Sequence, residues 1–130
     1  MAHYNDTSAL AKLVLAEPET PALQAWFADA DRQPVSCDLA RTELLRTVRR
    51  AAPDHLVRAR AVLDSVTLLD VSTAIFDHAG LLDPTTLRTL DAIHLAAALV
   101  LGDELDAMVT YDDRLAQAAL ANGIAVISPA

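Results

Sequence analysis

Four acidic residues stand where the chain is expected to pass from a strand into a helix, or within the first turns of a helix. They are Asp6 in YNDTSAL, Glu43 in LARTELLR, Asp91 in LRTLDAIHLA and Asp112 in VTYDDRL. They lie far apart in the sequence, so only the fold can bring them together. Four carboxylates in one cleft would repel one another strongly unless cations neutralised them. The pattern therefore predicts a metal site.

Oxygen ligands suit Mg²⁺ or Mn²⁺, whereas Zn²⁺ prefers histidine and cysteine. A site of this kind points to phosphate chemistry, in which bound ions activate water and stabilise negative charge. We expect Asp6, Asp91 and Asp112 to hold one or two ions. Glu43 would hold a second ion or act through a water molecule. No serine or cysteine nucleophile system is evident, so no covalent intermediate is expected.

The composition is that of a folded, helix-rich chain. Its 130 residues are 53% hydrophobic and only 4% aromatic, which fits one domain over residues 1–130 with a single core. No apolar run reaches the roughly 18 residues of a membrane span, and the N-terminus does not resemble a signal peptide. The single cysteine, Cys37, is expected to be a small buried residue. We expect a cytoplasmic protein without a membrane segment.

The formal net charge of −8 argues against a nucleic-acid partner, because phosphate contacts normally come from Lys and Arg. The distribution of charge weakens this objection. Arg46, Arg49 and Arg50 lie close together in the sequence, and Arg88 lies three residues before Asp91. These four arginines are candidates for binding RNA phosphates, with a surface role as the alternative for Arg88. Acids that bind cations would also count as negative in the formal total.

Short apolar segments alternate with helical segments along the chain. This order predicts a parallel sheet with helices on both faces, a three-layer α/β/α sandwich. The expected strands are residues 2–5, 34–37, 66–71, 107–110 and 124–127. The expected helices are residues 8–15, 20–30, 38–50, 53–64, 72–82, 89–101 and 112–122.

In an open parallel sheet, ligands bind at the carboxyl ends of the strands. Asp6 and Asp112 each follow a strand and precede a helix, so both should lie at that edge. Asp91 falls in the first turn of its helix and can reach the same edge. Glu43 lies about one turn into its helix, and its longer side chain can point back to the cleft. Helix N-termini there favour anionic groups.

Each acid also has a purely structural interpretation. Asp6 and Asp112 could be ordinary helix caps, and Asp91 could be a partner of the helix dipole. Glu43 could pair with Arg46 or Arg50 on its own helix, which is the commoner fate of such a residue.

Several neighbours of the acids could support them. The hydroxyls of Ser8 and Thr110 could orient carboxylates, or they could serve as local caps. Asp113 could assist Asp112, although a solvated cap is the simpler interpretation. His94 shares a helix face with Asp91, and we expect it to be buried and hydrogen-bonded rather than a metal ligand.

These residues resemble the PIN-domain family, in particular the VapC toxins of bacterial toxin–antitoxin pairs. The resemblance covers the whole chain. It rests on four motifs in order, YNDTSALAKLVLAE, LARTELLRTVRR, LRTLDAIHLAAAL and VTYDDRLAQAALANGIAVISP, of which the third is the most specific. One departure is Asn5, which replaces a usual apolar residue before the first aspartate and makes the first strand polar.

The resemblance implies a five-stranded parallel sheet between helices, a homodimer, and Mg²⁺- or Mn²⁺-dependent endoribonuclease activity. Asp6, Glu43, Asp91 and Asp112 match the acidic quartet of the family. A cognate VapB-like antitoxin is also implied, with which the toxin forms a hetero-oligomer and whose tail blocks the acidic site.

Other functions fit less well. A phosphoacceptor receiver domain needs an acidic pair after its first strand and a lysine after its last, and the only lysine here is Lys12. A PIN-like module without catalysis, binding only protein or RNA, and a DNA-directed nuclease of the same fold remain alternatives. No base-reading module is visible, so the sequence does not indicate the RNA target.

Overall fold

Strand β1 (Ala2–Asn5) lies at the centre of the sheet, although its sequence AHYN is polar. The computed structural model describes residues 1–130, and all four residues of β1 are buried in it. The strand pairs in parallel with β2 (Gln33–Cys37) on one side and β4 (Leu105–Val109) on the other. Tyr4 faces the main core, and the Asn5 amide donates to the His3 carbonyl at 3.0 Å. The Asn5 side-chain oxygen has no partner, so its burial is a cost that the strand tolerates.

All five strands are parallel, in the order β3-β2-β1-β4-β5. The edge strands are β3 (Thr67–Leu69) and β5 (Val126–Ile127), and both are shorter than the sequence predicted. The prediction of a five-stranded parallel sheet between helices is confirmed. Parallel strands require crossover connections, and here each connection carries at least one helix.

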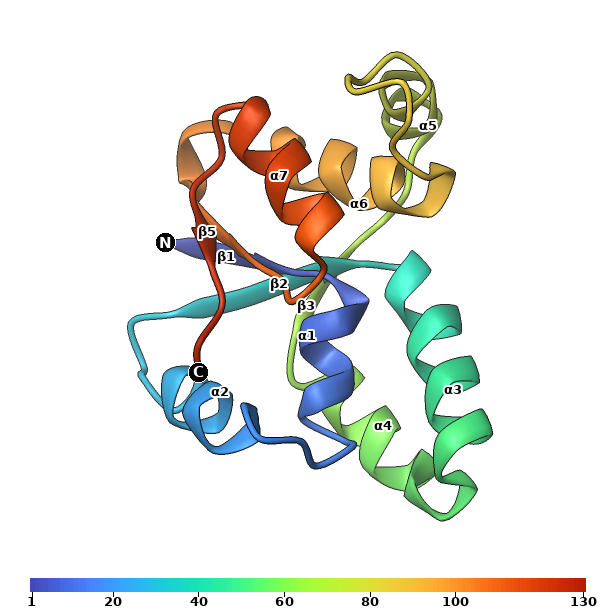
Figure 1. Ribbon diagram of the computed structural model, residues 1–130, viewed down its shortest axis with the longest axis vertical. Helices are drawn as coiled ribbons and strands as arrows, with labels where there is room; N and C mark the ends of the chain where they lie inside the picture. Colours follow the sequence, from blue (N-terminus) through green and yellow to red (C-terminus); the bar gives the residue numbers. More distant parts are fainter.

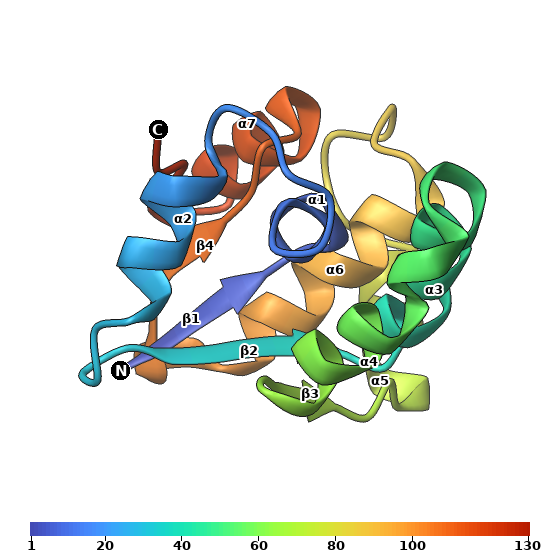
Figure 2. The same ribbon diagram turned by 90° about the horizontal axis from the view of Figure 1, so that it is seen from below.

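The helices form a layer on each face of the sheet (Figure 1). One layer contains α1 (Thr7–Lys12), α2 (Thr20–Phe27), α3 (Leu39–Ala51) and α4 (Leu56–Asp64). The other contains α5 (Thr73–Ala79), α6 (Thr89–Val100) and α7 (Asp113–Ala121). Short 3₁₀ turns at Pro53–His55 and Gly102–Glu104 precede α4 and β4. Figure 2 looks onto the sheet from the side of α1–α4, with α1 at the end of β1 and α6 behind the sheet.

Helix α6 is apolar almost all round because it lies in the main core. Seven of its residues are buried, from Ala92 to Ala98. The alanines let the helix approach the strands closely, where Met108 and Tyr4 pack with it. Gly102, with φ +52, follows the helix, which is a backbone conformation that glycine adopts without strain. This packing fixes the direction of α6 and therefore the position of Asp91 at its start.

None of the helices is both long enough and apolar enough to cross a membrane.

Candidate functional site

Asp6 follows the central strand and is the most buried of the four acids, with 4% of its surface exposed. One carboxylate oxygen accepts hydrogen bonds from the Ser8 hydroxyl at 2.7 Å and the Ala9 amide at 3.1 Å. The other accepts from the Thr110 hydroxyl at 2.7 Å. Burial raises the pKa of Asp6, and the hydrogen bonds from Ser8 and Thr110 oppose that rise. Asp6 is thus both the cap of α1 and a carboxylate held in one orientation.

Asp112 plays the corresponding part after β4. Its Oδ1 accepts from the amides of Arg114 at 2.9 Å and Leu115 at 3.1 Å and so caps α7. Its own amide donates to the Thr110 hydroxyl at 3.1 Å. Thr110 therefore links Asp112 to Asp6, and Ser8 and Thr110 both orient a carboxylate. Asp113 is exposed in the first turn of α7, as a solvated residue would be.

Asp91 lies in the first turn of α6 and is partly buried. Burial raises the pKa of Asp91, and repulsion from Asp112 and from Asp6 raises it further. Asp6 and Asp112 lie at the carboxyl ends of the neighbouring strands β1 and β4, the edge at which ligands bind in parallel sheets.

Glu43 reaches the same edge from α3, and its partners are not on its own helix. Its Oε1 lies 2.6 Å from Nε2 of His94 and accepts from the Thr7 hydroxyl at 2.7 Å. The alternative prediction that Glu43 pairs with Arg46 or Arg50 is wrong, because the side chain turns inward to α6 and α1 instead. Burial favours the neutral acid, yet the hydrogen bonds from His94 and Thr7 outweigh it and lower the pKa of Glu43.

His94 is buried and fully hydrogen-bonded, as predicted. Its Nδ1 lies 2.7 Å from the Tyr4 hydroxyl and 3.9 Å from the Cys37 sulfur. Burial disfavours the charged ring, but the contacts with Cys37 and Glu43 prevail and raise the pKa of His94 to about 10. The protonated ring donates to Glu43 on one side and to Tyr4 on the other. Cys37 is fully buried, as expected.

The acids carry the ligand atoms that a hard divalent cation prefers. No set of three or more His, Cys, Asp and Glu side chains lies close enough to share one metal ion in this structure. Asp6 still has acceptor capacity, since each carboxylate oxygen offers about two lone-pair sites. The donor set fits Mg²⁺ or Mn²⁺, and the acids would have to draw closer to hold it.

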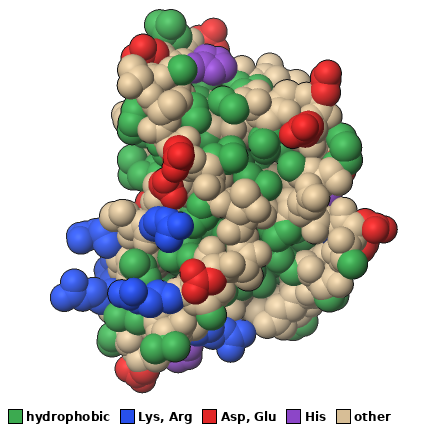
Figure 3. Space-filling model, turned by 180° about the vertical axis from the view of Figure 1, so that it is seen from behind, with side chains coloured by type: hydrophobic (Ala, Val, Ile, Leu, Met, Phe, Trp, Pro, Cys, Tyr) green, Lys and Arg blue, Asp and Glu red, His purple; other side chains and the backbone are tan.

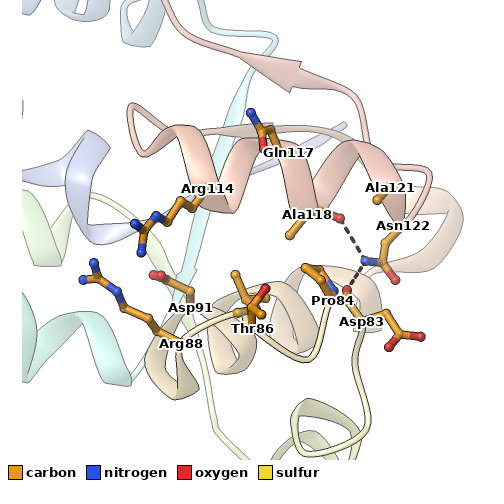
Figure 4. Close-up of a pocket in the computed structure, with 11 residues that line it drawn as sticks. Asp83, Pro84, Thr86, Arg88, Asp91, Arg114, Gln117, Ala118, Ala121 and Asn122 are labelled. Carbon is orange, nitrogen blue, oxygen red and sulfur yellow. Dashed lines mark hydrogen bonds between the residues drawn. The ribbon is translucent and has the colours of Figure 1, made fainter.

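Candidate phosphate-binding arginines lie at two places on the molecule. Arg46, Arg49 and Arg50 are exposed on α3 and line a hollow of about 410 Å³. Lys and Arg side chains gather on one side of the molecule, as Figure 3 shows. Arg88 precedes α6, and its side chain reaches toward Asp91 from one side of a groove (Figure 4).

Sequence reasoning did not identify three contributors to the site, which are Thr7, Tyr4 and Arg114. Thr7 and Tyr4 contact Glu43 and His94 across long sequence separations, for which a single sequence carries no signal. Arg114 enters the groove beside Asp91 from α7. Its position two residues after Asp112 is the only local indication.

The chain is similar to known proteins over nearly its whole length. Residues 4–121 match the PIN domain. Over 130 residues the chain is 42% identical to Ribonuclease VapC47 of Mycobacterium tuberculosis, with 97% of this chain and 96% of that protein covered. It is 44% identical over 127 residues to Ribonuclease VapC46 of the same species, with the same coverage.

Solved structures share the fold at low sequence identity. The M. tuberculosis VapC20 toxin, described as cleaving the sarcin–ricin loop, aligns with a TM-score of 0.77 at 17% identity over 98% of this chain and 99% of that one. A toxin–antitoxin complex from Klebsiella pneumoniae aligns with a TM-score of 0.70 at 22% identity over 98% of both chains. VapBC2 of Rickettsia felis, bound to promoter DNA, aligns with a TM-score of 0.71 at 11% identity over the whole of both chains.

Proposed function

The chain belongs to the PIN-domain family, and from that premise we propose that it is a divalent-metal-dependent endoribonuclease, the toxin of a toxin–antitoxin pair. Relatives at 42% and 44% identity over almost the whole chain are named as VapC ribonucleases. The fold of the chain matches a VapC toxin and toxin–antitoxin complexes.

The observation that carries the proposal is the placement of three aspartates: Asp6 and Asp112 follow the neighbouring parallel strands β1 and β4, and Asp91 lies in the first turn of α6. Burial and repulsion from Asp112 and Asp6 raise the pKa of Asp91. Carboxylates with perturbed pKa values at the ligand-binding edge of a parallel sheet are typical of a functional site. Asp6, Asp91 and Asp112 would hold Mg²⁺ or Mn²⁺, with Glu43 binding directly or through water.

A bound divalent ion supplies charge neutralisation and activation of water for attack on a phosphodiester. The contribution of the chain is to hold the carboxylates. Ser8, Thr110 and the Ala9 amide fix both oxygens of Asp6. His94 and Thr7 fix Glu43 in its charged form. These contacts set the orientation of the acids before the substrate arrives, which lowers the cost of assembling the reaction geometry.

The substrate proposed is single-stranded or looped RNA, bound through its phosphates. Arg46, Arg49 and Arg50 form an exposed basic surface on α3, the helix that also carries Glu43. Contacts of this kind position a nucleic acid without reading its sequence. They also offset locally the formal charge of −8, which would otherwise repel RNA.

We further propose that the protein acts in the cytoplasm, as a homodimer held inactive by a VapB-like antitoxin. The support is that two structures sharing this fold are a toxin–antitoxin complex and a VapBC assembly. An antitoxin tail near the acids would block RNA from reaching them.

Side-by-side incubation of purified protein with RNA and single-stranded DNA of the same sequence tests the proposal. With Mg²⁺ or Mn²⁺ present, we expect cleavage of RNA and little of DNA, and no cleavage by Asp91→Asn. Preferential cleavage of DNA would identify a DNA nuclease. Absence of any cleavage by a folded, metal-binding protein would identify a binding module.

A further inference from the structure

A groove of about 800 Å³ runs between the start of α6, the loop before it, and one face of α7. Its walls are formed by residues of these three segments, Asp83, Pro84, Thr86, Leu87, Arg88, Asp91, Arg114, Gln117, Ala118, Ala121 and Asn122. The volume lies in the range of pockets that hold small ligands, roughly 300–1,000 Å³. Asp91, at one end, joins the groove to the acidic cluster.

The end of the groove beside Asp91 carries two arginines. The guanidinium groups of Arg88 and Arg114 both extend toward the Asp91 carboxylate, one from the α6 side and one from α7 (Figure 4). Ion pairs of lysine and arginine in this structure involve only Lys12, Arg32 and Arg41. Arg88 and Arg114 therefore remain available to an anion. Guanidinium groups bind phosphate oxygens through paired donors.

The rest of the groove offers neutral polar groups. Thr86 is exposed on the loop, its side chain lies at the groove (Figure 4), and its hydroxyl makes no hydrogen bond within the chain. At the far end, the Asn122 amide nitrogen donates to the carbonyls of Asp83 at 3.1 Å and Ala118 at 2.8 Å. These two bonds orient the Asn122 amide and leave its oxygen as a fixed acceptor.

We propose that this groove is a nucleotide subsite for the RNA strand next to the bond that is cut. Arg88 and Arg114 bind the strand's phosphates beside Asp91. The adjoining nucleotide lies along the groove toward Asn122, where the Thr86 hydroxyl and the Asn122 amide oxygen contact its base or ribose. This inference rests on the proposed ribonuclease function and adds the place and direction of the bound strand.

RNA fits the groove better than a protein partner does. Of the eleven lining residues only Pro84, Leu87, Ala118 and Ala121 are apolar. A peptide-binding groove generally needs apolar pockets for anchoring side chains. The unpaired cations stand at the end nearest the acids, where a phosphate has to enter.

The test compares Arg114→Ala with Arg60→Ala, a matched control. Arg60 is an exposed arginine of α4 on the other face of the sheet, and it makes no ion pair. Binding of a short single-stranded RNA is measured by fluorescence anisotropy with Asp6→Asn in the background, so that the RNA stays intact. Cleavage is measured in the otherwise wild-type protein.

We expect Arg114→Ala to weaken RNA binding and to raise KM by about tenfold, the effect of losing one charge-assisted contact. Arg114→Lys should recover part of the loss, and Arg60→Ala should match the wild type. Thr86→Val should change the distribution of cleavage sites, mapped by sequencing the RNA ends.

Equal RNA binding and cleavage by Arg114→Ala and the wild type would overturn the subsite. Normal RNA binding with weakened antitoxin binding in Arg114→Ala would also overturn it and assign the groove to the protein partner. If the wild-type protein neither binds nor cuts RNA, the proposed ribonuclease function itself is refuted. This outcome differs from failure of the subsite, in which the wild type still cuts RNA.

Discussion

The imidazole Nε2 of His94 lies 2.6 Å from Oε1 of Glu43 and joins α6 to α3 across the acidic edge of the sheet. His94 is in turn held by the Tyr4 hydroxyl at 2.7 Å. The ring therefore connects the buried core of β1 to a carboxylate at the surface. We interpret His94 as a positioning residue, which acts on the reaction only through Glu43.

His94→Gln is expected to lower the rate of RNA cleavage roughly 10–100-fold, the usual cost of removing a group that orients a metal-binding side chain. The physical reason is that Glu43 loses its strongest hydrogen bond and its fixed direction. Initial rates at increasing Mn²⁺ concentration measure the effect, and excess Mn²⁺ should restore part of it.

The double variant of His94→Gln and Glu43→Gln checks the route of this effect. If His94 acts through Glu43, the combined loss should be close to the larger of the two single losses. Losses that multiply would show that His94 contributes independently of Glu43.

Thr110→Val is expected to destabilise the metal-free protein by about 1–3 kcal/mol, the cost of leaving buried polar groups without partners. Thr110 is fully buried, donates to Asp6 at 2.7 Å and accepts from the Asp112 amide at 3.1 Å. Urea denaturation in EDTA measures the change. Thr85→Val, at an exposed position, is the control and should stay within about 0.5 kcal/mol of the wild type. Equal stability of the two variants would refute the structural role assigned to Thr110.

The pH dependence of stability is expected to include a contribution from His3, which packs edge-on against Trp26 with ring centroids 5.0 Å apart. Burial lowers the pKa of His3 below 6.5, although Asp106 opposes the change. A group whose pKa falls on folding stabilises the protein above its unfolded pKa. The free energy of unfolding should therefore decrease as the pH falls from 6.5 through the lower pKa of folded His3.

Trp26 is the only tryptophan, so its fluorescence reports the titration of His3 directly. The midpoint should lie below 6.5, and it should fall further in Asp106→Asn, because the opposing carboxylate at 3.6 Å is lost. A midpoint above 6.5 would show that the attraction of Asp106 exceeds the cost of burial.

Asp6→Asn and Asp91→Asn are both expected to abolish RNA cleavage while leaving the fold intact. The substitutions remove like-charge repulsion, since Asp6 and Asp112 both raise the pKa of Asp91. Circular dichroism in EDTA should therefore resemble that of the wild type, and Asp91→Asn should unfold at an equal or higher temperature. If either variant is unfolded, its loss of cleavage would reflect a structural role of the aspartate and would not support a role as a metal ligand.

The parallel order of strands and helices could be predicted from the sequence because apolar runs, helix breakers and caps are local signals. The placement of Asp6 and Asp112 at one edge of the sheet follows from that order. Strand and helix ends were less predictable. Residues 66–71 have strong β propensity, yet pairing with β2 fixes only Thr67–Leu69 as a strand.

The partners of Glu43 could not be predicted, because they depend on how α3 and α6 pack, and residues 51 positions apart share no local pattern. Local spacing favoured Arg46, whereas tertiary packing supplied His94. The polar strand AHYN likewise takes the centre of the sheet because Tyr4 reaches the main core and His3 packs with Trp26.

Whether the acids act through a bound divalent ion can be measured most directly by RNA cleavage with metal removed and returned. Wild-type protein stripped with EDTA should not cut RNA, and added Mn²⁺ or Mg²⁺ should restore cleavage. Asp6→Asn treated in the same way should remain inactive at every metal concentration. Full cleavage of RNA by the wild type in EDTA would contradict the metal-dependent role of Asp6, Asp91 and Asp112.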